Sequence, residues 1–136
     1  MSELIQEHEV NIDRLESIFK CEYYNTEHDR DGNLIVHAEG AHIYVRIDSD
    51  RKFIGFFAFW YLKERAKEID KLRFASQLNF DYVFLRWSVP APDMLSATYE
   101  FPFEGGITPH FISHMFKLFL RAFSIPPTVD KVRVLR

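Results

Sequence analysis

Apolar and polar residues alternate along two neighbouring stretches in the second half of the chain. From Tyr82 to Val89, and again from Met94 to Phe103, every second residue is apolar. This is the period of a strand that buries one face more than the other. Pro90 and Pro92 lie between the two stretches and lack the N–H that a strand ladder needs. The pattern therefore predicts two strands joined by a tight turn.

A long apolar helix is expected after the second strand. Gly105 and Gly106 interrupt the strand, and Thr108 with Pro109 supplies a cap residue and a proline at the first helical position. We expect Pro126-Pro127 to end this helix. Its polar residues form one narrow stripe: His110, Ser113, His114, Lys117, Arg121 and Ser124. The remaining apolar arc covers roughly 200°, which is wider than one sheet face buries.

The first part of the chain predicts a helix followed by three or four strands. Apolar residues recur at helical spacing over Glu3–Phe19, opposite an acidic face, and Ser2 is the expected cap. The predicted strands cover Cys21–Asn25, which is short, Leu34–Ala38, His42–Asp48 and Phe53–Leu62. The last of these is apolar on both faces, as a central strand is when each side is covered.

A second helix is predicted over Lys63–Leu78, with Asn79 able to close it in a left-handed conformation. The apolar positions assigned to it are Ala66, Ile69, Leu72, Phe74, Ala75 and Leu78. Residues 127–136 form a basic tail whose end, Val129–Arg136, alternates. Two readings of this tail stay open, an added edge strand and a loose segment.

These elements define an α+β protein, a mainly antiparallel β-sheet with helices packed on it. The order is α-β-β-β-α-β-β-α, with a fourth early strand if Cys21–Asn25 pairs. A chain of 136 residues suits a single domain over residues 1–136.

Composition and charge exclude several classes of function. The chain carries a net charge of -3, so no basic surplus attracts nucleic acid. Cys21 is the only cysteine, which fits a reducing compartment. The longest apolar run, Phe53–Leu62, is far short of the roughly 20 residues of a membrane helix. We expect a soluble cytoplasmic protein that contacts neither nucleic acid nor membrane. The many aromatic residues are expected in the core.

No set of residues in the sequence indicates a particular reaction. His110 and His114 are spaced as two ligands on one helix face, but their segment offers no third ligand, so we expect no metal. The glycine pair lacks the spacing of a phosphate loop, and no serine elbow is present. We therefore expect no catalytic residues and no cofactor.

Several positions carry a family resemblance. They are Leu78-Asn79, the strand pair bent at Pro90, and Glu104-Gly105-Gly106-Ile107-Thr108 leading into an apolar helix with Phe119 near its end. On these positions, the chain from Leu15 to Ile125 resembles the YbjN family of bacterial sensory transduction regulators. The resemblance implies the fold of type III secretion chaperones and a non-enzymatic, protein-binding role, often as a dimer. The aromatic strand Phe53–Tyr61 and the basic tail depart from the family pattern.

The wide apolar arc of the last helix suggests a function. Its flanks are either covered by other helices or the tail, or form a dimer or partner surface; the candidates are Phe111, Phe116, Leu118 and Leu120. The leading hypothesis is a chaperone-like or regulatory protein-binding module that acts as a homodimer. The alternative is a ligand-binding domain or enzyme with a pocket between the sheet and the last helix, where His110 or His114 acts as acid–base.

Overall fold

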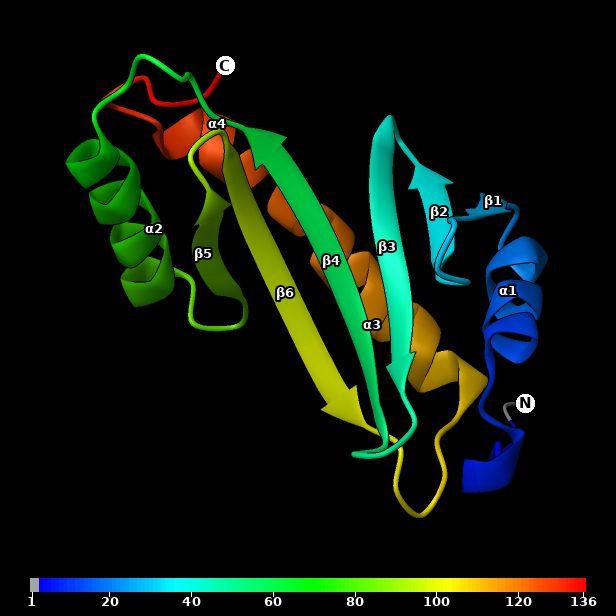
Figure 1. Ribbon diagram of the computed structural model, residues 1–136. Coiled ribbons are helices and arrows are strands. Elements are labelled where there is room, and N and C mark those ends of the chain that lie inside the picture. The colour runs from blue at the N-terminus through cyan, green and yellow to red at the C-terminus, as the bar shows by residue number, and fades with distance from the viewer. Residues whose placement is uncertain (1–2) are drawn as a thin grey trace. The chain divides into compact units, whose positions relative to one another are not determined.

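The computed structural model describes residues 3–136, which form two compact units. The first unit comprises the chain up to Phe56 together with Glu100–Arg121. The second comprises Phe57–Tyr99 and Ala122–Arg136. Six strands form an antiparallel sheet in the order β1-β2-β3-β4-β6-β5, and β4 and β6 contribute residues to both units (Figure 1). The predicted α+β class and the order of elements are confirmed.

The element bounds are as follows. The strands are β1 (Asn25–His28), β2 (Leu34–Ala38), β3 (Ala41–Asp48), β4 (Phe53–Tyr61), β5 (Arg86–Ala91) and β6 (Met94–Pro102). The α-helices are α1 (Ile12–Cys21), α2 (Glu68–Asp81), α3 (Pro109–Arg121) and α4 (Ile125–Val129), and the 3-10 turns are η1 (Glu7–Glu9) and η2 (Ala122–Ser124). None of the helices between residues 3 and 136 is long and apolar enough to cross a membrane.

The N-terminal segment departs from the predicted helix over Glu3–Phe19. Ile5 instead pairs with Ile107, with N–O distances of 2.7 and 3.0 Å in the two directions. The helix begins at Ile12, where the Asn11 side-chain oxygen accepts the backbone N–H of Arg14 at 2.8 Å. Ser2, the cap expected from the sequence, lies outside the described residues.

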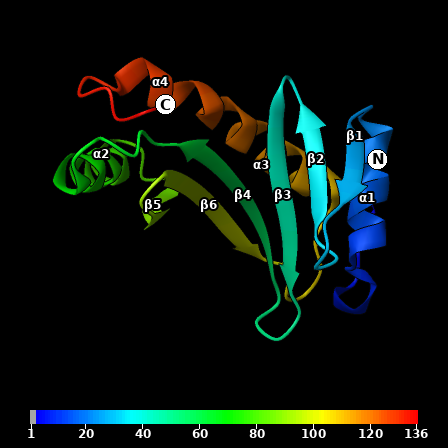
Figure 2. The ribbon, with the colours of Figure 1, turned by 45° about the horizontal axis from the view of Figure 1, so that its top comes forward.

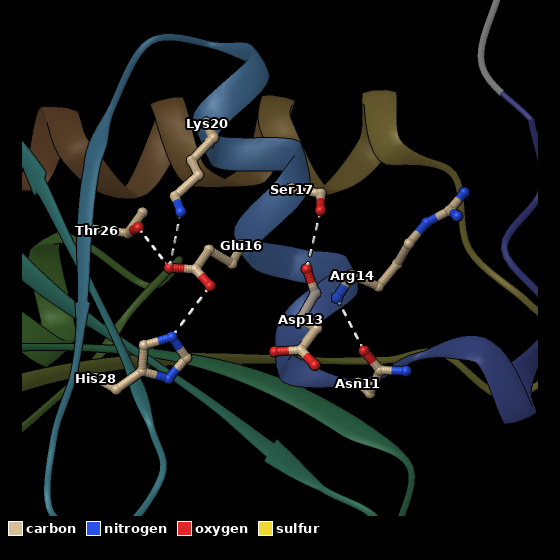
Figure 3. Close-up of polar contacts among 8 residues, drawn as sticks. All are labelled: Asn11, Asp13, Arg14, Glu16, Ser17, Lys20, Thr26 and His28. Carbon is tan, nitrogen blue, oxygen red and sulfur yellow. Dashed lines mark hydrogen bonds and ion pairs between the residues drawn. The ribbon is translucent and has the colours of Figure 1, made fainter.

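Glu16 holds α1 against β1 (Figure 3). Its carboxylate accepts the Thr26 hydroxyl at 2.6 Å and contacts Nε2 of His28 at 3.0 Å. The ammonium of Lys20 lies 3.6 Å away on the same helix. The hydrogen bond from Thr26, then that from His28, lowers the pKa of Glu16 because both stabilise the charged carboxylate.

The core of the first unit is aromatic, as expected. Phe19 of α1 and Phe116 of α3 are both fully buried, and their ring centroids lie 4.7 Å apart. Phe56 of β4 contacts the same two rings and Phe101 of β6. Figure 2 shows α1 and α3 on the same side of β2 and β3. The two helices therefore meet over one sheet face, and their outer surfaces lie next to each other.

In the second unit, α2 packs against β5, and Phe74, Ala75 and Leu78 of the predicted apolar positions are buried. Ile69 and Leu72, also predicted as apolar positions of this helix, are exposed. Lys71 is buried beside Phe74 and Leu78, and its ammonium donates to the carbonyl of Pro92 in the β5–β6 turn. Because that carbonyl accepts the charge-assisted bond, the lysine is accommodated on the inner face.

The observed boundary between α2 and β5 also differs from the predicted one. The helix continues past Asn79 to Asp81, so Asn79 does not close it, and β5 begins only at Arg86. Val83 and Phe84, assigned to the strand from their alternation, lie in the connection and are exposed.

The tail pairs with the end of β4. Leu135 bridges Leu62, and the N–H of Lys63 donates to the carbonyl of Val134 at 2.8 Å. Val134 is buried, so the edge-strand reading describes residues 134–136 better than the loose one. Pro126-Pro127 do not end α3, which stops at Arg121; they occupy the first turn of α4, where a missing N–H costs little.

Candidate functional site

The four residues proposed for a partner surface on α3 fall in different environments. Phe116 is fully buried against Phe19 and Phe56, so it belongs to the core of the first unit and cannot form a surface. Phe111 is 40% exposed, with its ring 5.7 Å from Phe101, whereas Leu118 and Leu120 are half-buried. Of the four, Phe111 alone offers substantial free apolar surface.

The start of α3 is built as predicted. The Thr108 hydroxyl accepts the N–H of Phe111 at 3.1 Å, and Pro109 is the first helical residue. Gly105 and Gly106 both adopt positive φ, at 84° and 106°. A side chain at Gly106 would also meet the backbone oxygen of Ile5 at 3.0 Å, so the N-terminal segment leaves room only for glycine.

A groove of ≈ 580 Å³ lies between α1 and α3. Two helical stripes line it, each spaced i, i+3, i+4, i+7. The stripe on α1 is Arg14, Ser17, Ile18 and Cys21, and the stripe on α3 is His110, Ser113, His114 and Lys117. This groove lies between two helices and not between the sheet and α3, where the alternative hypothesis placed a pocket.

Glu22, directly after α1, ties the two helices together. The buried hydroxyl of Ser113 donates to its carboxylate at 2.7 Å, and the ammonium of Lys117 lies 3.6 Å from it. The hydrogen bond from Ser113 is the main cause that lowers the pKa of Glu22, and the charge of Lys117 adds to it. The polar stripe of α3 is therefore partly a helix–helix contact.

His110 and His114 are exposed on the groove wall, with stacked rings whose centroids lie 6.3 Å apart. The fold brings Cys21 and Glu22 to the same groove, which sequence spacing does not reveal. Nevertheless, no three His, Cys, Asp or Glu side chains within residues 3–136 gather as a metal site.

The outer face of α2 is a second candidate surface, which the sequence analysis missed. Ile69, Leu72 and Phe80 are 50%, 46% and 80% exposed, and Val83 just beyond the helix is 85% exposed. At about 100° per residue, Ile69, Ser76 and Phe80 lie within about 40° of one another, with Leu72 to one side. We call Ile69, Leu72, Ser76 and Phe80 the outer stripe of α2. It lies opposite the buried residues Lys71 and Leu78.

Together, the antiparallel sheet and its covering helices define a small α+β protein. The profile of the YbjN family, described as "Putative bacterial sensory transduction regulator", matches residues 11–124. The chain belongs to this family, as its resemblance suggested.

A solved structure agrees in fold. It is described as the crystal structure of YbjN, "a putative transcription regulator from E. coli", and superposes with a TM-score of 0.76 at 10% identity. The match covers 93% of this chain and 96% of that one. At this identity the comparison establishes the fold only. No curated protein matches the chain.

Proposed function

We propose that this chain is a non-enzymatic regulatory module of the cytoplasm that binds proteins and acts as a homodimer. Membership of a family described as sensory transduction regulators supports the regulatory role. The observation that carries the proposal is the outer stripe of α2. Large apolar side chains at this exposure are costly in water when several are contiguous, and such patches mark interaction sites.

The outer stripe is arranged symmetrically about Ser76. Leu72 lies four residues before Ser76 and Phe80 four residues after it, while Ile69 and Val83 lie seven residues to either side. Two copies of α2 that pack antiparallel around a two-fold axis at Ser76 therefore place each Leu72 against the partner's Phe80. The small Ser76 at the axis lets the two helices approach closely. Such self-complementarity is what a two-fold interface requires.

Because the outer stripe of α2 is self-complementary, we infer that a second copy of this chain covers it. Phe111 on α3 stays available as a surface for a different protein.

The proposal is tested by light scattering on the wild type and on Leu72→Glu and Phe80→Glu. A charge in the interface would be desolvated without a partner, so both variants should be monomers in conditions where the wild type is a dimer. Because both side chains are exposed, the fold should survive, which circular dichroism checks.

Val132→Glu is the matched control. Val132 is also an exposed apolar residue, but it lies in the tail and should leave the dimer intact. A wild type that is monomeric at tens of micromolar, or a dimer that both α2 variants retain, would contradict the homodimer formed through α2.

A further inference from the structure

The groove between α1 and α3 carries an excess of positive charge in a chain whose net charge is -3. Arg14 enters it from α1 and Lys117 from α3, and the imidazoles of His110 and His114 on α3 also line it. Among the described residues that line it, the one carboxylate is that of Glu22, which is already bound by Ser113 and Lys117. Donors therefore outnumber free acceptors around the groove.

Arg14 is the most available of these donors. Its backbone N–H binds Asn11, but within residues 3–136 its guanidinium has no hydrogen-bond or ion-pair partner. Figure 3 shows this side chain directed away from Asp13 and Glu16, the acidic residues of its own helix. A guanidinium held apart from the neighbouring carboxylates keeps its planar set of donors for an external anion.

The shape of the groove adds to this charge pattern. Its volume of ≈ 580 Å³ is that of a small-molecule site and far exceeds what a free inorganic anion fills. Ile18 and Pro109 supply apolar wall next to the cations. The groove thus offers one charged region and one apolar region, which suits an anion attached to an organic body.

We propose that the α1–α3 groove binds a small phosphate monoester. The phosphate, close to a dianion at neutral pH, would contact Arg14, which has no carboxylate partner among residues 3–136, and the organic part would lie on Ile18 and Pro109. This site is independent of self-association through α2, so a regulatory dimer could carry one ligand in each subunit.

The test is an NMR titration of the ¹⁵N-labelled protein with glucose 6-phosphate, inorganic phosphate and acetate. Glucose 6-phosphate should shift the backbone amides around Arg14, Cys21 and His110 in a saturable way, more tightly than inorganic phosphate does. Arg14→Ala should weaken binding about tenfold, because a charge-assisted hydrogen bond is lost. Arg14→Lys should be intermediate, since it keeps the charge without the planar donor set.

Two further variants test whether binding depends on the charges that line the groove. Arg30→Ala removes another exposed arginine, from the β1–β2 turn, and should bind as the wild type does. Glu22→Gln removes the competing carboxylate beside Lys117 and should tighten binding several-fold, an effect opposite to that of Arg14→Ala.

Three outcomes would overturn the proposal. They are an absence of saturable shifts around the groove, equal affinity for acetate and glucose 6-phosphate, and wild-type affinity in a folded Arg14→Ala variant. Binding of inorganic phosphate alone would also count against it, because the groove would then not take the organic body.

Discussion

The side-chain amide of Asn79 pairs with both backbone polar groups of Trp87. Its Nδ2 donates to the Trp87 carbonyl at 2.7 Å, and its Oδ1 accepts the Trp87 N–H at 2.8 Å. Trp87 lies in β5, the edge strand next to β6. The Asn79 side chain therefore makes the two backbone hydrogen bonds that a neighbouring strand would make with Trp87. It thereby protects β5 from pairing with a second chain at that point.

Replacing this amide should destabilise the second unit. Asn79→Ala leaves the two backbone groups of Trp87 without their partner and should cost about 1–2 kcal/mol. Alanine is the better helix former, so the measured loss is a lower limit. Urea denaturation gives the value, with Gln77→Ala as the control because, within residues 3–136, the Gln77 side chain bonds only to Asp81 on its own helix. Equal losses in the two variants would argue against the role of Asn79.

The cap of α3 should make a measurable contribution. Thr108→Ala removes the acceptor of the Phe111 N–H and should lower the free energy of unfolding by about 1 kcal/mol. Thr108→Ser keeps the hydroxyl and should retain most of that stability. The denaturation midpoints of the wild type, Thr108→Ala and Thr108→Ser test this prediction. An alanine variant as stable as the serine variant would contradict a stabilising role of the cap.

The stability of the first unit should depend on pH through Glu16. Its pKa is lowered on folding, chiefly by the Thr26 hydroxyl and then by His28. The ionised carboxylate therefore stabilises the fold above the ordinary glutamate pKa of 4.5, and this contribution is lost as the pH falls through the lowered folded value. Glu16→Gln should be less stable than the wild type at neutral pH, and the two should converge in acid.

The control for this pH dependence is Glu64→Gln, at an exposed position after β4. It should leave the difference between neutral and acid stability as it is in the wild type. Denaturant titrations across the acid range measure the effect. A constant gap between Glu16→Gln and the wild type at every pH would show that ionisation of Glu16 is not the cause.

Phe116 and Phe111 should differ sharply on truncation. Phe116→Ala removes a fully buried ring from the aromatic core and should cost about 3–5 kcal/mol. Phe111→Ala, at a 40% exposed position, should cost about 1 kcal/mol. Thermal unfolding of both variants provides the comparison. A milder effect at Phe116 than at Phe111 would contradict its place in the core.

The histidine pair should not retain metal. We expect no stoichiometric zinc in the purified protein, because two imidazoles on one helix turn give a weak site without further ligands. Elemental analysis tests this directly. Stoichiometric zinc that disappears in His110→Ala would make the prediction wrong.

Features with local signals could be predicted from the sequence. The start of α3 depends on Thr108 and Pro109, and the turn before it depends on two adjacent glycines with positive φ. The start of β6 at Met94 likewise follows from alternation and the preceding proline. In each case the residues that determine the structure lie within a few positions of one another.

Features set by distant partners could not be predicted. Lys71 faces inward because the Pro92 carbonyl receives it, and the apolar residues of α2 lie on two opposite faces, so periodicity does not identify the buried one. The groove between α1 and α3 depends on Glu22 meeting Ser113, which is 91 residues away. No local sequence pattern predicts the contact between Glu22 and Ser113. The polar residues of α3, spaced i, i+3, i+4, i+7, were nevertheless recognised from the sequence as one stripe.

The pairing of Ile5 with Ile107 has a consequence for biosynthesis. Ile5 is buried in the folded chain, but its partner is 102 positions later, counted as 107 minus 5. At about 5–20 residues per second, the ribosome needs roughly 5–20 s to make the intervening chain. During that interval Ile5 has no native strand partner and remains accessible to chaperones and proteases, so this segment docks only after Ile107 has left the ribosome.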